Sequence, residues 1–254
     1  MDNWRTGITS FNDDGIWYCG HDVAGLMRTE SFTGTIFLLH QGRLPTDGER
    51  RLFDAILLGI ADHGPGAPSA MASRTVATGN RVAPEAAVAA GVLAIGDAHG
   101  GAGWACQRLL AEAIDRVARE GVSEDIAADD VVRAEIAAGR RLPGFGHRTH
   151  SQDPRTTVLL SLAVDLGLAG AGVQMVRAFE GAIARQVKPL PINVDAAMAA
   201  ILHDLGFLPI MAKLMFIIGR VAGLSAEVLE EYTRERPMRV KVPVTYDGPP
   251  VRPS

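Results

Sequence analysis

The sequence has little of what would place it in several large classes of protein. Only two cysteines occur in 254 residues, Cys19 and Cys106, and neither a CxxC pattern nor a histidine-rich segment accompanies them. A disulfide framework and a metal site are therefore not predicted. The net charge of −4 lacks the basic excess that nucleic-acid-binding proteins show, so no nucleic-acid partner is expected.

Long uninterrupted apolar runs are also missing. The most apolar long stretch, residues 207–224, contains Lys213 and Arg220 and therefore predicts a buried helix rather than a membrane span. The first residues lack the basic segment followed by an apolar one that a signal peptide needs. We therefore expect a cytoplasmic protein without a membrane partner.

Strand patterns are scarce. Only residues 8–19 favour a hairpin, with Asp14-Gly15 as its turn. The alternating strands and helices of Rossmann and barrel folds are missing, and no GxxxxGK[ST] loop occurs. The predicted fold class is mainly α. Helical spacing, caps and glycine stops predict helices over residues 31–39, 46–61, 84–95, 104–120, 123–139, 154–166, 171–187, 194–205, 208–222 and 225–234.

Residues 142–155 combine a flexible turn with ionisable groups. Gly144 and Gly146 permit a sharp turn and a close approach of the backbone to a ligand. His147 follows and can exchange a proton near neutral pH. Asp153-Pro154 predicts an N-cap and a first helical residue, which places Arg155 at a helix start suited to an anion. An ordinary loop between two helices fits the same pattern.

Three of the seven histidines, His63, His99 and His147, lie beside glycine-rich turns rather than on helix faces. Such positions present an imidazole to a cleft, although a histidine near a helix C-terminus also serves as a simple cap. Asp195 lies in the first turn of a helix capped by Asn193, where the helix dipole favours an ionised base. The same placement fits an acidic residue that only stabilises the helix.

Arg220 is a charge inside an apolar run, and a buried arginine needs an anionic partner from the protein or from a substrate. Together with the histidines and Asp195, it suits a small polyanion that undergoes proton transfer next to a carbonyl. The residues alone do not specify the reaction.

In order along the chain, these motifs resemble the citrate synthase superfamily. The resemblance rests on residues 31–46, Ala61-Asp62-His63, residues 97–102, the Gly146-His147…Asp153-Pro154-Arg155 pair and Asn193-Val194-Asp195. It implies one citrate-synthase-like helical domain over residues 1–254, with a large lobe and a small mobile lobe at about 104–190.

The short interval from Thr46 to His63 favours one branch of this superfamily, which contains citryl-CoA lyase and the synthase-like module of ATP-citrate lyase. Only one helix fits there. His99 is a feature of citrate synthases that ATP-citrate lyase lacks, so the chain combines features of both branches.

The resemblance implies site roles. Proton transfer and hydrogen bonding to the reacting atoms are implied for His99, His147 and Asp195. Substrate binding is implied for His63, Arg148, Arg155, Arg220 and Arg236, and binding of coenzyme A for Pro143, Gly144, Phe145 and Gly146. Arg236 is expected to act across the interface of a homodimer, and a higher oligomer is also compatible with the family. No permanently bound cofactor is implied, because the coenzyme A thioester is a substrate.

The implied reaction is cleavage of citryl-CoA, or a close analogue, to acetyl-CoA and oxaloacetate through an enol(ate). The alternative is condensation of an acyl-CoA with oxaloacetate, as in citrate and 2-methylcitrate synthases. A non-catalytic protein that binds coenzyme A or citrate is the third hypothesis. Because the same residues serve both directions, the motifs do not choose between cleavage and condensation.

Overall fold

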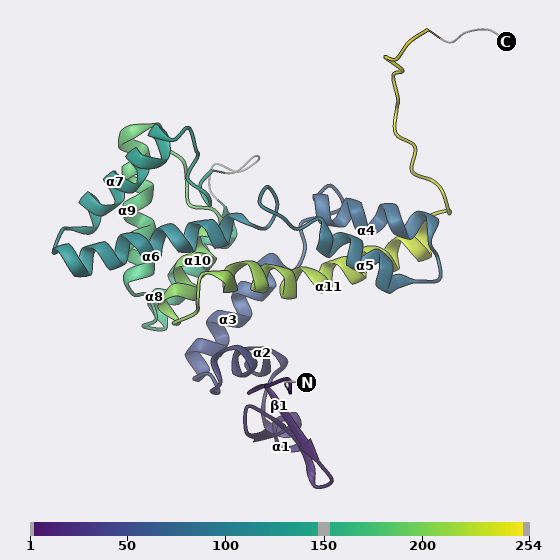
Figure 1. The fold of residues 1–254 in the computed structure, drawn as a ribbon, viewed down its shortest axis with the longest axis horizontal. Coiled ribbons are helices and arrows are strands. Elements are labelled where there is room, and N and C mark those ends of the chain that lie inside the picture. Colours follow the sequence, from purple (N-terminus) through teal and green to yellow (C-terminus); the bar gives the residue numbers. More distant parts are fainter. Residues whose placement is uncertain (1–2, 147–152, 251–254) are drawn as a thin grey trace. The chain divides into compact units, whose positions relative to one another are not determined.

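The computed structural model describes residues 3–146 and 153–250 (Figure 1). The chain divides into two compact units, one formed by Met1–Asp62 and Ile95–Arg220 and the other by His63–Ala94 and Val221–Ser254. The segment expected to form a small mobile lobe, residues 104–190, lies wholly within the first unit. The mainly α fold class is confirmed by the described residues.

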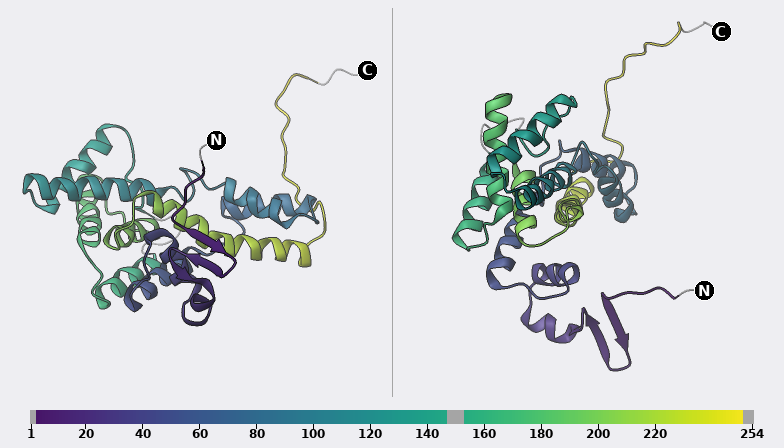
Figure 2. Two further views of the ribbon diagram at one scale, coloured as in Figure 1. Left: turned by 60° about the horizontal axis from the view of Figure 1, so that its bottom comes forward. Right: turned by 60° about the vertical axis from the view of Figure 1, so that its left-hand side comes forward.

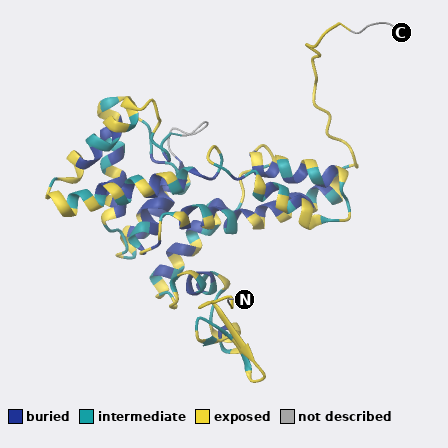
Figure 3. Ribbon diagram, viewed as in Figure 1, coloured by how far each residue is buried: buried dark blue, intermediate teal, exposed yellow. Residues whose placement is uncertain are grey.

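The N-terminal hairpin is confirmed, but its turn is Asp13-Asp14 rather than the predicted Asp14-Gly15. Strands β1 (Thr9–Asn12) and β2 (Gly15–Tyr18) pair antiparallel, with Asn12 opposite Gly15. A two-residue strand, β3 (His21–Asp22), joins β2 and was not predicted. Much of this sheet is exposed (Figure 3). Helix α1 (Val23–Thr29) follows, and Asp22 caps it by accepting from the backbone N–H of Gly25.

The next two helices begin where their caps predict. Ser31 caps α2 (Phe32–Gln41), which ends at Gly42 in the left-handed conformation. Helix α3 (Asp47–Ile60) opens with the predicted capping box between Thr46 and Glu49. The Glu49 carboxylate also accepts two bonds from Arg43, at 2.7 and 2.9 Å, and these bonds lower its pKa to about 2.

The rest of the first unit is a helical core built around α10 (Val194–Asp204). All of its residues from 194 to 202 are buried except Asp195, which is half-buried. Small residues let neighbouring helices approach it closely: a Cβ on Gly103 would lie 2.9 Å from Cε of Met198. Helices α6 (Ala102–Glu120), α8 (Pro154–Asp165) and α9 (Ala171–Gln186) pack against α10, and α7 (Glu124–Ala137) packs against α6 and α9.

The last helix corrects one prediction. Instead of two helices over 208–222 and 225–234, a single helix α11 runs over Ile210–Arg234. Gly223 suggested a break, but a glycine inside a helix costs only about 1 kcal/mol relative to alanine. Burial of Leu224 and Val228 on the same helix offsets that cost. The helix carries residues of both units, with Arg220 in the first and Val221 in the second.

The second unit consists of α4 (Pro68–Gly79), α5 (Pro84–Leu93), the end of α11 and the segment that follows. Helices α4 and α5 lie side by side (Figure 2). Helix α4 was not predicted, because its alanine, serine and threonine residues give a weak apolar periodicity. Within this unit Gly91 is tightly enclosed, since a Cβ there would lie 2.8 Å from Cδ1 of Leu224. Among the described residues, no helix is both long and apolar enough to cross a membrane.

Candidate active site

The glycine loop at 143–146 lies against the segment that leads into α10. The backbone N–H of Gly146 donates to the carbonyl of Pro191 at 2.8 Å, and the N–H of Asn193 donates to the carbonyl of Gly144 at 3.0 Å. The side-chain amide of Asn193 donates to the carbonyl of Gly146 at 3.1 Å. Two motifs separated by about fifty residues of sequence are therefore held together by three hydrogen bonds.

Gly144 is required by this arrangement. It is buried and has φ +87°, and a Cβ on it would lie 2.6 Å from Cβ of Ala196. Gly146 has a similar φ of +85°, but a Cβ there would meet nothing nearer than Cδ2 of Leu190 at 3.6 Å. The close neighbour of Gly144 is thus helix α10, and the predicted approach of this loop to a ligand stays a prediction.

Asp195 immediately precedes Ala196, the neighbour of Gly144, in the first turn of α10. Asn193 caps α10 by accepting from the N–H groups of Asp195 and Ala196, as predicted. Oδ1 of Asp195 is buried and has no hydrogen-bond partner among the described residues. Burial raises the pKa of Asp195 above its usual range, and nearby Arg155 and Arg220 only partly oppose this. The helix start alone predicted a more easily ionised carboxyl, so burial has the larger effect.

Two guanidinium groups lie at the C-terminal end of α3. Nη1 of Arg155 donates to the carbonyl of Gly59 at 3.1 Å, and Nε of Arg220 donates to the carbonyl of Ile60 at 3.0 Å. These carbonyls belong to the last turn of a helix, where the backbone lacks internal partners. Arg155 also forms a two-point ion pair with Asp153, with distances of 3.0 and 2.8 Å.

Arg220 is almost fully buried, with 2% of its surface exposed. Burial lowers its pKa, while the negative charges of Asp62 and Asp195 oppose that effect. The predicted need for a buried anionic environment is therefore met in part by the protein itself. Asp195, Arg155 and Arg220, which come from three different helices, are brought within electrostatic range of one another.

His99 lies in a tight turn in which its backbone exchanges two hydrogen bonds with Gly96, at 2.9 and 3.2 Å. Its ring meets the edge of Phe216, with centroids 5.7 Å apart. Phe216 also contacts Arg220, whose guanidinium lies over the ring, 4.7 Å from the ring centroid. Phe216 thus contacts both predicted site residues, and a Cβ on Gly100 would lie 2.6 Å from it.

Sequence reasoning missed Phe216. The signal that could have identified it is its spacing, since it precedes Arg220 by four residues on one helix and so shares a face with it.

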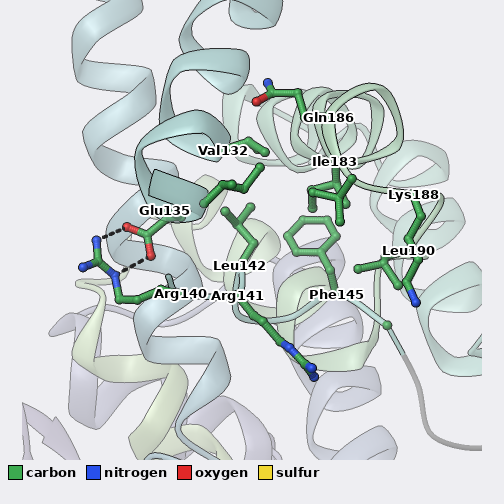
Figure 4. Close-up of a pocket in the computed structure, with 13 residues that line it drawn as sticks. Val132, Glu135, Arg140, Arg141, Leu142, Phe145, Ile183, Gln186, Lys188 and Leu190 are labelled. Atoms are coloured by element: carbon green, nitrogen blue, oxygen red, sulfur yellow. Dashed lines mark hydrogen bonds and ion pairs between the residues drawn. The ribbon is translucent and has the colours of Figure 1, made fainter. Parts of the chain in front are cut away.

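A cavity of about 680 Å³ opens beside the glycine loop (Figure 4). Its volume lies in the range of small-molecule sites. Its apolar part includes Phe145, whose ring also packs edge-on against Phe179 at 6.4 Å. Glu135 and Arg140 pair at one side, which lowers the pKa of Glu135. The lining residues are Val132, Glu135, Ile136, Arg140, Arg141, Leu142, Phe145, Gly146, Ile183, Gln186, Val187, Lys188 and Leu190.

The remaining predicted site residues are not grouped by the structure. His147 and Arg148 lie outside the described residues. His63 and Arg236 belong to the second unit, and both are exposed. The roles predicted for these four residues therefore stay predictions. No cluster of potential metal ligands occurs in the described part of the chain.

Comparisons with known proteins identify the family of the chain. The family model "Citrate synthase, C-terminal domain" matches residues 46–241. Citrate synthase 2 of Bacillus subtilis is 30% identical over 212 residues, covering 82% of this chain and 54% of that protein. The chain thus spans about half the length of the curated relatives it matches.

Solved structures extend the likeness to the whole chain. Citryl-CoA lyase from Hydrogenobacter thermophilus superposes with a TM-score of 0.89 and 38% identity, over 98% of this chain and 96% of the lyase. ATP citrate lyase from Methanothrix soehngenii, solved with citrate and coenzyme A, shares the fold with a TM-score of 0.79 and 19% identity, over 98% of this chain and 42% of that one. From the matched family model and the shared fold, the chain belongs to the citrate synthase family.

Proposed function

We propose that this protein cleaves citryl-CoA, or a close analogue, into acetyl-CoA and oxaloacetate through an enol(ate) intermediate. In this reaction the tertiary hydroxyl loses its proton and becomes the ketone of oxaloacetate. The carbon–carbon bond breaks, and its electron pair passes to the thioester as an enolate. A proton added to the enolate carbon then gives acetyl-CoA.

The observation that carries this proposal is the likeness to a citryl-CoA lyase over nearly the full length of both chains. The short interval between Thr46 and His63 supports the same lyase branch of the family, because α3 is the only helix among the described residues there. Both features concern the whole architecture rather than a short motif.

The site chemistry fits the reaction. Arg155 and Arg220 supply fixed positive charge for the carboxylates of the oxaloacetate part. Asp195 is suited to hold the proton that reaches the enolate carbon, because burial raises its pKa. His99 would hydrogen-bond the thioester oxygen, and His147 would take the hydroxyl proton. Such groups typically contribute about 100-fold to 10,000-fold each.

Coenzyme A is proposed to occupy the cavity beside the glycine loop. Phe145 and Leu142 give it an apolar part that could hold the adenine or pantetheine portion. Arg141 and Lys188 are exposed there and form no ion pair with any described residue, so they are available for phosphates. The backbone of Pro143, Gly144 and Gly146 is proposed to line the approach. Coenzyme A enters as part of the substrate, with no permanently bound cofactor.

A cytoplasmic homodimer is part of the proposal, with the 104–190 lobe closing on the ligand and Arg236 serving the partner subunit's site. Mixed dimers test the shared site. A chain carrying Arg236→Ala should recover activity when paired with a chain carrying Asp195→Asn, because one intact site forms. Mixed dimers that stay inactive would contradict the exchange of Arg236.

The second candidate is condensation of acetyl-CoA or propionyl-CoA with oxaloacetate. It is favoured by the curated relatives, which include citrate synthases and a citrate/2-methylcitrate synthase of Bacillus subtilis that is 27% identical over 229 residues. A non-catalytic protein that binds coenzyme A or citrate is the third candidate. The buried Oδ1 of Asp195, which has no hydrogen-bond partner among the described residues, favours turnover over simple binding.

One assay separates the candidates. Purified protein is given citryl-CoA, and oxaloacetate is followed by coupled oxidation of a reduced nicotinamide cofactor, with free citrate measured in parallel. Release of oxaloacetate that Asp195→Asn abolishes supports the lyase. Production of free citrate without oxaloacetate contradicts it and favours the synthase. If neither product forms, and acetyl-CoA with oxaloacetate also releases no coenzyme A, the non-catalytic candidate gains.

A further inference from the structure

The chain turns back on itself immediately after α11, and we call residues 235–239 the hook. Arg81, in the connection between α4 and α5, holds its start. Nη1 of Arg81 donates to the backbone carbonyl of Glu231 at 2.6 Å, and Nη2 donates to that of Glu235 at 2.7 Å. Carbonyls at a helix C-terminus lack partners within the helix, so one guanidinium satisfies two of them.

The end of the hook is held by a buried carboxylate. Glu231 is fully buried and accepts from Arg239 at 2.8 and 2.5 Å, and from Arg74 at 3.0 Å. The backbone is also fixed, because the N–H of Met238 donates to the carbonyl of Thr78 at 2.9 Å. The N–H of Arg239 donates to the Thr78 hydroxyl at 3.2 Å. The hook is therefore pinned on both sides to the end of α4.

This pinning maintains a conformation that the chain would not favour alone. Met238 has φ +57°, a left-handed conformation that costs a residue with a side chain about 1–2 kcal/mol. Between the two pinned ends lies Arg236, which is exposed and forms no ion pair with any described residue. The hook thus leaves the Arg236 side chain exposed, while its other arginine, Arg239, pairs with the buried Glu231 carboxylate.

We propose that Arg81 and Arg239 are positioning residues that fix the hook so that Arg236 meets a substrate carboxylate. This inference rests on the proposed function, in which Arg236 serves the partner subunit's site. It extends that function to residues of the second unit that do not touch the substrate. A purely structural role predicts lower stability and no selective effect on carboxylate binding, so the two roles differ in a measurable way.

The test is a double-mutant cycle on the full chain, read by calorimetric binding of oxaloacetate and by citryl-CoA turnover. Arg81→Met should weaken oxaloacetate binding about 10-fold to 100-fold, because a displacement of about 1 Å in a positioned group can cost about 100-fold. In the Arg236→Ala background the same change should cost less than about twofold, because the group that it positions is gone. Arg234→Gln is the matched control, since Arg234 lies nearby on α11 with an exposed side chain, and it should bind like the wild type.

A second, milder variant keeps the test decisive if Arg81→Met does not fold. Thr78→Val keeps the shape of the side chain and removes only the hydroxyl bond to the hook, so a smaller loss in the same direction is expected, again absent with Arg236→Ala. Equal losses with and without Arg236 would overturn the inference. If the wild type binds oxaloacetate but does not cleave citryl-CoA, the lyase proposal fails. The double-mutant cycle on oxaloacetate binding then still tests the positioning role of Arg81 and Arg239. A wild type that does not bind oxaloacetate overturns both.

Discussion

Gly144 and Gly146 form a matched pair that tests how the loop meets α10. Both have nearly the same left-handed φ, +87° and +85°. An added methyl group at Gly144 would lie 2.6 Å from Cβ of Ala196 and 3.1 Å from its backbone N. The same group at Gly146 would meet only Leu190, at an ordinary 3.6 Å. Substitution by alanine therefore imposes the same backbone strain at both positions and a steric clash at only one.

The magnitudes follow from these contacts. The left-handed conformation should cost either alanine about 1–2 kcal/mol of unfolding free energy. Overpacking typically adds about 1–3 kcal/mol, and this applies to Gly144 alone. Gly146→Ala should thus lose about 1–2 kcal/mol, and Gly144→Ala about 2–5 kcal/mol. In a chain of this size each kcal/mol lowers Tm by about 2–4 °C, so Gly144→Ala should melt about 2–12 °C below Gly146→Ala.

Thermal unfolding followed by helical circular dichroism measures the difference. Citryl-CoA turnover by the folded variants adds a second readout, because only Gly144→Ala pushes on the first turn of α10, which carries Asp195. Equal melting temperatures for the two variants would refute the reasoning, since the loop would then relax away from Ala196 without cost. In that case Gly144 would be needed for its φ alone.

Four further predictions concern charge. Glu49→Gln should lower the unfolding free energy by about 2 kcal/mol at neutral pH, allowing for the half-exposed Arg43 partner. The pKa of Glu49 is about 2 in the folded protein, below the usual 4.5. Urea titrations should therefore show the difference between wild type and variant disappear as the pH falls from 4.5 to about 2. Asp195→Asn should abolish turnover. It should also raise Tm at neutral pH, because the ionised carboxyl is less favourable in the buried site than in the unfolded chain. An unchanged or lower Tm would count against this effect of burial. In the wild type, condensation activity should fall as the pH drops through the raised pKa of Asp195, since the base must be ionised. Arg220→Lys should weaken oxaloacetate binding in calorimetry about 30-fold to 1,000-fold by losing the planar fork, and affinity within threefold of the wild type would contradict that role.

Much of the local structure follows from short-range signals. The capping box at Thr46 and Glu49 and the Asn193 cap depend on groups within a few residues of one another, and both are found. The hairpin also forms, but its turn is Asp13-Asp14 rather than the predicted Asp14-Gly15, because Gly15 pairs with Asn12 as the first residue of β2. The continuity of α11 does not follow from such signals. Gly223 is unfavourable for a helix locally, and only packing of its neighbours in the folded chain compensates.

The sequence by itself determined the helical class, most helix boundaries and, through the order of its motifs, the family. Only the tertiary structure decided the state of the site. It placed Gly144 against Ala196, set Arg155 and Arg220 on the end of α3, and buried Oδ1 of Asp195. The helix start predicted a more easily ionised Asp195, yet desolvation raises its pKa. The physical reason is that a cap acts over one helical turn, whereas burial depends on every segment that packs around the carboxyl.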